Sequence, residues 1–141
     1  MNIMRSVARS RVQRGPGSSP IRILVVDDEP LSARAIQRLF ETRGLEVVTA
    51  CDGADALARL RADGPYALVL SDVEMPRMNG IELLERVRAE IHIPVVLMSG
   101  GGIEDLPWRS ADHGDGFVPK PIDFNAALET IFGAILRVQK G

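Results

Sequence analysis

The chain has 141 residues, of which 45% are hydrophobic and 26% charged, and its formal net charge is −2. These proportions are typical of one soluble globular domain and exclude disorder throughout the chain. No stretch is apolar for long enough to cross a bilayer, and the N-terminus lacks the apolar core of a secretory signal, so we expect a cytoplasmic protein without membrane insertion. The only cysteine, Cys51, cannot form a disulfide within the chain, and we expect it to be a buried thiol.

The first 20 residues differ in composition from the remainder. They hold four arginines and no acid, and they end in a cluster of glycine, proline and serine. We therefore predict a flexible basic arm over residues 1–20 and one domain over residues 21–141. That domain keeps 13 of the 17 basic side chains and all 19 acidic ones, so its net charge is near −6. A solvated tail is the simplest interpretation of the arm; contact with nucleic acid or an acidic partner, or a transit peptide, are the alternatives.

From residue 21 onward, short β-branched runs alternate with amphipathic stretches whose apolar residues recur at helical spacing. The predicted strands are residues 22–26, 46–50, 66–71, 93–99 and 116–118. The predicted helices are residues 31–44, 53–64, 80–90 and about 123–138. This (βα)5 alternation requires parallel strands covered by helices on both faces. The predicted fold class is α/β, a doubly wound three-layer sandwich around a parallel five-stranded sheet.

Polar side chains follow four of the predicted strands. Asp27 and Asp28 come after the first strand, Asp72 after the third, Ser99 after the fourth and Lys120 after the fifth. Loops at the carboxyl ends of the strands form the functional crevice of a doubly wound sheet. We therefore expect three carboxylates, a hydroxyl and an ammonium group to converge there.

This set of side chains suits a magnesium-dependent phosphoryl transfer. Clustered carboxylates repel one another unless a cation neutralises them, and Mg²⁺ prefers oxygen ligands shared with a phosphate. Asp28 and Asp72 are the predicted direct ligands, and Asp27 is predicted to hold a bound water. Lys120 suits a phosphoryl oxygen, and Ser99 offers a hydroxyl donor. A carboxylate beside a metal and a lysine can attack phosphorus to give an acyl phosphate, so Asp72 is the predicted nucleophile.

Four strings carry a family resemblance: "VVDDEP", "LVLSDVEMPRMNG", "VVLMSG" and "FVPKP". In this order and spacing they resemble the receiver domain of bacterial two-component response regulators, over about residues 21–138. The resemblance implies a flavodoxin-like sheet with strand order 2-1-3-4-5. It also implies that Asp72 accepts a phosphoryl group from a phosphohistidine on a histidine kinase or histidine phosphotransferase.

The resemblance also implies a role for each matching residue. Asp27 and Asp28 would be the acidic pair that binds Mg²⁺, together with Asp72 and the backbone carbonyl of Glu74. Lys120 would contact the phosphoryl group. The switch residues would be Ser99 and Phe117, and the peptide bond before Pro121 would be cis.

Two departures from the family pattern concern function. Glu74 places an extra negative charge two residues after the predicted phosphoacceptor, where the side chain in similar domains faces the crevice and tunes the loss of phosphate. The segment over residues 100–116 contains three consecutive glycines and Pro107, so we expect its helix to be short, displaced or mobile. That helix belongs to the surface with which similar domains contact their partners.

Three function classes stay open. The first is a stand-alone phosphoacceptor switch, which is not an enzyme beyond self-catalysed phosphorylation and dephosphorylation. It would have no DNA-binding domain in the chain, would be a monomer or weak dimer, and would act on an unknown downstream protein. The second is a receiver that no longer takes phosphate and serves as a docking module. The third is a magnesium-dependent aspartyl phosphohydrolase.

Each residue also has an ordinary structural interpretation. Asp27 with Glu29 could simply cap the first helix. Asp72 could be a loop acid, Lys120 a surface lysine and Phe117 a core residue.

Overall fold

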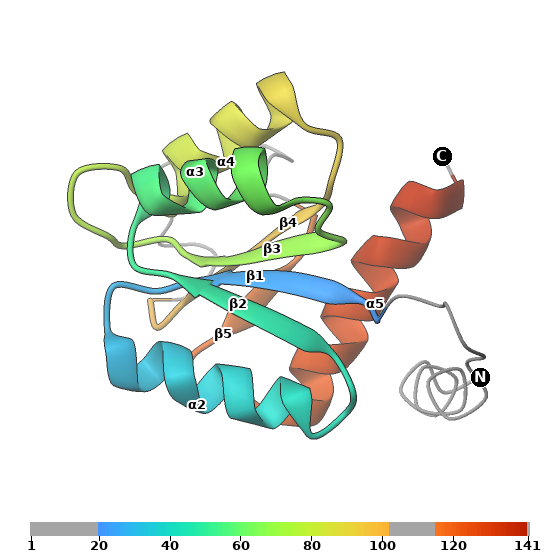
Figure 1. Cartoon of the computed structure of the whole chain (residues 1–141). Helices are drawn as coiled ribbons and strands as arrows, with labels where there is room; N and C mark the ends of the chain where they lie inside the picture. Colours follow the sequence, from blue (N-terminus) through green and yellow to red (C-terminus); the bar gives the residue numbers. More distant parts are fainter. Residues whose placement is uncertain (1–19, 102–114, 141) are drawn as a thin grey trace.

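The computed structural model describes residues 20–101 and 115–140 (Figure 1). The strands in this part of the chain are β1 (Arg22–Val26), β2 (Glu46–Ala50), β3 (Leu68–Asp72), β4 (Val95–Ser99) and β5 (Phe117–Pro119). The helices are α2 (Pro30–Glu41), α3 (Gly53–Asp63), α4 (Gly80–Glu90) and α5 (Phe124–Lys140). All the predicted strands and helices are present, with ends that differ from the prediction by up to three residues. The irregular helix expected after the fourth strand falls largely on residues 102–114, which lie outside the described residues.

The described strands form one five-stranded sheet in the order β2-β1-β3-β4-β5, and every pair of neighbours is parallel. The prediction of a doubly wound α/β fold with strand order 2-1-3-4-5 is confirmed. The strand order reverses between β1 and β3, because β1 pairs with β2 on one side and with β3 on the other. Ligands of doubly wound folds bind at the carboxyl end of such a reversal.

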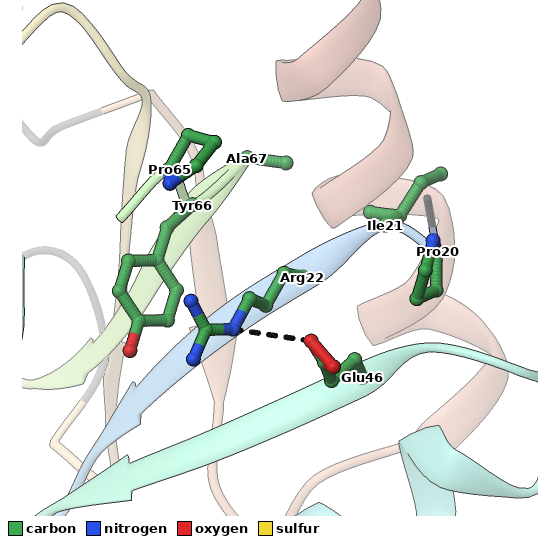
Figure 2. Close-up of a pocket in the computed structure, with 7 residues that line it drawn as sticks. All are labelled: Pro20, Ile21, Arg22, Glu46, Pro65, Tyr66 and Ala67. Carbon is green, nitrogen blue, oxygen red and sulfur yellow. Dashed lines mark ion pairs between the residues drawn. The ribbon is translucent and has the colours of Figure 1, made fainter. Parts of the chain in front are cut away.

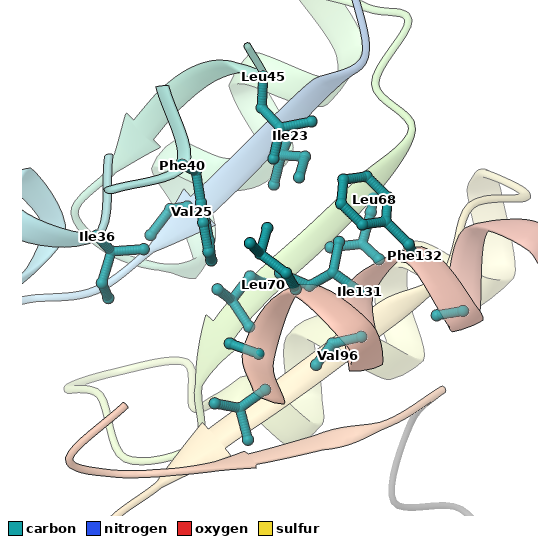
Figure 3. Close-up of a cluster of buried hydrophobic side chains, with 14 of the residues drawn as sticks. Ile23, Val25, Ile36, Phe40, Leu45, Leu68, Leu70, Val96, Ile131 and Phe132 are labelled. Atoms are coloured by element: carbon teal, nitrogen blue, oxygen red, sulfur yellow. The ribbon is translucent and has the colours of Figure 1, made fainter. Parts of the chain in front are cut away.

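The sheet lies between two layers of helices (Figure 1). Successive residues of a strand point to opposite faces, so each face of β1 contributes to a different core. Ile23 and Val25 pack with side chains of α2 and α5 in the core drawn in Figure 3, whereas Leu24 and Val26 pack with α3 and α4. Every residue of β3 and β4 is buried, as expected for central strands covered on both faces.

The first helix buries a narrower face than its sequence pattern suggests. Ala33, Ile36 and Phe40 of α2 are buried, but Leu31 is 84% exposed and Leu39 is 41% exposed. The expectation of a buried thiol was also wrong, because Cys51 is exposed. It follows the last residue of β2, which is an edge strand, so one side of the segment faces solvent.

Local signals set the helix boundaries. α4 begins with a capping box, in which Asn79 accepts backbone hydrogen bonds and the Glu82 side chain accepts one from the backbone of Asn79. Asp52 caps α3 by accepting a hydrogen bond from the backbone of Asp55. Gly44 has φ 86°, and this left-handed residue turns the chain from α2 into β2. Among the helices of residues 20–101 and 115–140, none is long and apolar enough to cross a membrane.

Candidate functional site

Four strands deliver polar side chains to one edge of the sheet. Asp27 directly follows β1, Asp72 is the last residue of β3, Ser99 is the last residue of β4, and Lys120 directly follows β5. All four strands are parallel neighbours, so their carboxyl ends lie together. The structure thus gathers these predicted site residues at the reversal of strand order.

Lys120 joins the two buried carboxylates of this site. Its Nζ lies 2.7 Å from Oδ1 of Asp72 and 3.4 Å from Oδ2 of Asp27. Asp27 is only 1% exposed and Asp72 only 6%, whereas Asp28 is exposed. The ammonium group therefore bridges acids that come from two different strands, and each of these contacts is a charge-assisted interaction shielded from water.

Asp27, Asp28 and Asp72 can each offer one carboxylate oxygen such that these oxygens all lie within 4.8 Å of one another. Hard oxygen donors at this spacing suit Mg²⁺, which binds through carboxylates and commonly keeps several of its waters. Two of the three donors are buried and one is exposed, so the cluster combines fixed ligands with an opening to solvent. The residues present therefore fit a divalent cation.

Backbone contacts fix Asp27 before any ligand arrives. Its N–H donates to the carbonyl of Ala50 at 3.1 Å, and its Oδ1 accepts the N–H of Glu29 at 2.9 Å. Ser32 also donates to this carboxylate from the first turn of α2. The carboxylate thus orders the turn into α2 while its second oxygen faces Lys120.

The site is electrostatically asymmetric. Burial, with the charge of Asp27 adding to it, raises the pKa of Asp72 to about 7, although Lys120 opposes the shift. Burial also acts to raise the pKa of Asp27, but hydrogen bonds from Ser32, Asp72 and Glu29, with the charge of Lys120, lower it below its usual range. Without a cation Asp27 is therefore the ionised member, and Asp72 holds a proton at neutral pH about as often as not.

Lys120 stays charged in this setting. Burial alone would lower its pKa, but the carboxylates of Asp72 and Asp27 raise it above the usual value. The backbone N–H of Lys120 donates to the carbonyl of Ser99 at 3.0 Å, which ties the loop after β5 to the end of β4. The Lys120–Pro121 peptide bond is cis, and that prediction is confirmed.

The two expected switch residues occupy the ends of β4 and β5. Ser99 is 6% exposed, and its Oγ accepts the N–H of Gly101 at 3.1 Å. Phe117 is partly buried and packs against the core on the α3 and α4 side of the sheet. Both positions are compatible with the assigned roles, and the roles themselves stay predictions.

The loop after Asp72 returns tightly to the start of α4. The N–H of Gly80 donates to the carbonyl of Val73 at 2.8 Å, and a Cβ at Gly80 would lie 2.2 Å from the carbonyl oxygen of Asp72. Glu74, two residues after the carboxylate, is exposed. The loop therefore closes directly after Asp72, and the side chain of Glu74 within it reaches solvent.

Two of the surface hollows that the described residues line lie at opposite edges of the sheet. One of about 240 Å³ adjoins the site and is lined by Asp27, Pro30, Ala33, Arg34, Gln37, Thr49, Ala50 and Cys51. The other, of about 510 Å³, is drawn in Figure 2 and lies at the amino ends of β1 and β3. In it Arg22 pairs with Glu46 at 3.1 Å, and its guanidinium lies 4.5 Å from the centre of the Tyr66 ring. The sequence contained no signal for this second hollow.

Comparison with known proteins gives a consistent result. The chain matches the model of the response regulator receiver domain over residues 23–132. A two-component response regulator of Arabidopsis thaliana is 37% identical over 126 residues, which cover 86% of this chain and 24% of that protein. The chemotaxis protein CheY of Treponema pallidum is 35% identical over 120 residues, covering 82% of this chain and 83% of that protein. The chain spans between about a quarter and a half of the length of the first curated relatives it matches.

Solved structures agree with the sequence relatives. The receiver domain (CheY-like) from Methylobacillus flagellatus superposes with a TM-score of 0.72 and 31% identity, covering 83% of this chain and 99% of that one. The shared fold therefore covers nearly all of that chain and most of this one.

Proposed function

Because the chain belongs to the family of response regulator receiver domains, which act in two-component signalling, we propose that Asp72 is its phosphoacceptor. The donor would be a phosphohistidine on a histidine kinase or histidine phosphotransferase. The observation that carries the proposal is the position of Lys120 Nζ, 2.7 Å from Asp72 and 3.4 Å from Asp27. A buried carboxylate beside a fixed cation and a second acid is the arrangement that a phosphoryl-transfer site needs.

Asp27, Asp28 and Asp72 would hold Mg²⁺, with Asp27 acting through a water, and the backbone carbonyl of Glu74 would complete the protein ligands. When bound, Mg²⁺ would neutralise these acids and the negative charge of the phosphoryl group. The mutual spacing of the three carboxylates supports this assignment. The chemistry of the transfer then depends on the residues that the chain supplies.

Asp72 attacks phosphorus as the carboxylate, so it must first lose the proton that burial favours. One carboxylate oxygen forms the new O–P bond while the P–N bond to the donor histidine breaks, and the electron pair of that bond returns to the imidazole. Lys120 keeps its positive charge next to the attacking group, where it compensates negative charge on the phosphoryl oxygens. Asp27 stays ionised and orients Lys120.

The acyl phosphate adds negative charge at the carboxyl edge of the sheet, next to the ends of β4 and β5. Ser99 would donate its hydroxyl to the phosphoryl group, and Phe117 would change its packing as a result. This would alter the surface that binds a downstream protein. In this proposal the chain is a switch and not an enzyme with a separate substrate.

The proposal is tested by incubating the protein with Mg²⁺ and acetyl phosphate and measuring the intact mass. We expect a gain of one phosphoryl group that is absent without Mg²⁺ and absent in Asp72→Asn. A folded wild-type protein that binds Mg²⁺ and gains no phosphoryl group would contradict the phosphoacceptor role and favour a docking module. Steady release of phosphate from small phosphoesters would instead favour a phosphohydrolase.

A further inference from the structure

The loop over residues 73–79 connects the proposed phosphoacceptor to α4 and contains one strained residue. Arg77 has φ 67°, and the N–H of Met78 donates to the carbonyl of Pro76 at 2.7 Å across it, so Arg77 is the centre of a γ-turn, a positive-φ conformation that is costly for a residue with a Cβ atom. Arg77 is the only residue other than glycine with a positive φ in the part of the chain that the structure describes. Such a conformation persists only where other contacts hold it.

The side chain of Arg77 supplies one such contact. Its Nη2 donates to Oδ2 of Asp52 at 3.0 Å, across from the loop to the start of α3. The ion pair is asymmetric in exposure, since the Arg77 side chain is 79% exposed and the Asp52 side chain 16%. Arg77 therefore reaches from solvent to an acid that is partly buried.

The acceptor Asp52 is held in place by the cap of α3. Its Oδ1 accepts the N–H of Asp55 at 2.8 Å, and Oδ2 of Asp55 accepts the N–H of Cys51 at 3.1 Å. These reciprocal contacts fix the segment directly after β2. Ala50, the last residue of β2, accepts the N–H of Asp27, so the anchor of Arg77 belongs to the same rigid edge as the buried acids.

A packing contact accompanies the ion pair. Met78, next to Arg77, lies so close to Gly53 that a Cβ there would come within 2.5 Å of its Sδ. The loop is thus attached to the start of α3 by a polar contact at Arg77 and by close packing at Met78. At its other end the hydrogen bond between Gly80 and Val73 closes it.

We propose that the ion pair between Arg77 and Asp52 holds the loop after Asp72 in the shape that the metal site requires, which makes Arg77 a positioning residue. The inference rests on the proposed function, because it assumes that the backbone carbonyl of Glu74 is a ligand to Mg²⁺. In the sequence of the loop, Glu74 lies between Val73, which accepts the hydrogen bond from Gly80, and Arg77, which pairs with Asp52. Loss of the pair would let that carbonyl move, and Mg²⁺ would bind less tightly.

Simple charge arithmetic predicts the opposite result. Arg77 carries a positive charge on the loop that follows Asp72, so its removal alone should tighten Mg²⁺ binding. The positioning role predicts that removal weakens binding. The direction of the change in Arg77→Asn therefore separates the two, and asparagine is the appropriate replacement because it tolerates the left-handed conformation.

The experiment measures the Kd of Mg²⁺ by titration calorimetry for the wild type, Arg77→Asn, Asp52→Asn and the double variant. The Asp52→Asn change keeps a side-chain oxygen that accepts the hydrogen bond of the helix cap, so α3 stays capped. We expect each single variant to bind Mg²⁺ about 2- to 5-fold more weakly, the range of an exposed ion pair, and the double variant to be no weaker than the singles. Arg77→Lys should restore most of the affinity.

A matched control is Arg59→Gln, which removes exposed ion pairs to Asp55 and Asp63 from the same helix without touching the loop. Its Mg²⁺ affinity should equal that of the wild type. High salt should reduce the difference between wild type and Arg77→Asn, because an exposed pair is screened.

The outcomes separate this inference from the proposed function. A wild type that fails to bind Mg²⁺ overturns the proposed function itself. A wild type that binds, alongside an Arg77→Asn variant of equal or tighter affinity, overturns only the positioning role. Additive losses in the double variant would likewise show that the two residues act separately.

Discussion

The two edges of the sheet differ in how their charged side chains are paired and buried. At the amino edge Arg22 pairs with Glu46 one to one, and both side chains remain partly exposed, at 27% and 49%. At the carboxyl edge two buried acids share Lys120, and the third acid of the cluster is exposed. The first arrangement is close to neutral, whereas the second has more negative charge than Lys120 can compensate. The difference teaches that burial of unbalanced charge, and not the mere presence of charge, distinguishes the edge that holds the candidate site.

We expect the largest effect from removing the charge of Lys120 at the carboxyl edge. Lys120→Met keeps the length of the side chain but removes the charge that Asp72 and Asp27 share. We expect phosphorylation by acetyl phosphate to slow by about 100-fold, the effect of losing one fixed stabilising group in a shielded site. The rate of mass gain measures it. A rate within a few-fold of the wild type would show that the bridge has no role in the transfer.

The second-largest expected effect is a dependence of stability on pH that arises from Asp72. The pKa of Asp72 is about 7 in the folded protein and 3.8 in ordinary surroundings, so the folded state binds this proton more tightly than the unfolded state does. Without Mg²⁺, the free energy of unfolding should therefore fall as pH rises from about 4 to about 7, by a few kcal/mol. Urea unfolding at a series of pH values measures it.

Asp72→Asn is the matched variant for this measurement. It should lose most of the decline between pH 4 and 7, because the titrating group is gone. Asp27 contributes in the opposite direction, since its lowered pKa adds stability that is lost only as pH falls below about 4. A decline that persists unchanged in Asp72→Asn would assign it to another group.

A substitution at the amino edge should change stability only slightly, and it should raise stability rather than lower it. The hydroxyl of Tyr66 is buried and has no hydrogen-bond partner in the part of the chain that the structure describes. Tyr66→Phe removes this group and keeps the ring below Arg22, so we expect stability to rise by about 1 kcal/mol. Thermal unfolding measures the change. A loss of stability would reveal a partner for the hydroxyl.

Glu46→Gln should have the smallest effect. It breaks the pair with Arg22, which is partly exposed, and the expected cost is below about 1 kcal/mol. Phosphorylation should proceed at the wild-type rate, because the pair lies at the opposite edge from Asp72. A clear change in that rate would show that the two edges are coupled through the sheet.

The sequence pattern predicted a parallel sheet and the edge at which Asp27, Asp72 and Lys120 meet, whereas the strand order 2-1-3-4-5 came from the family resemblance. The alternation of short apolar runs with amphipathic stretches requires parallel strands, and parallel strands bring their carboxyl ends together. The same logic could not predict that Leu31 is exposed, because periodicity defines a helical face but not how much of it the neighbouring elements cover.

The contacts that loop residues make could not be predicted from the sequence for a different reason. The hydrogen bond from Ser32 to Asp27 and the pairing of Arg77 with Asp52 depend on the path of the backbone, to which no periodic pattern corresponds. Arginine is also an unusual residue for a left-handed position, so its identity pointed away from the observed turn.

The contact between Gly80 and the carbonyl of Asp72 has a consequence for how this chain can vary. Any side chain at position 80 would begin 2.2 Å from that oxygen, and the obstructing atoms are backbone that cannot rotate away. Replacement would push directly on the residue proposed to take the phosphoryl group. We therefore expect a saturation mutagenesis library, selected for signalling, to retain only glycine at this position, while the neighbouring exposed Glu74 tolerates many residues. The tolerance of the loop to mutation would then be limited by the short distance between Gly80 and the carbonyl oxygen of Asp72.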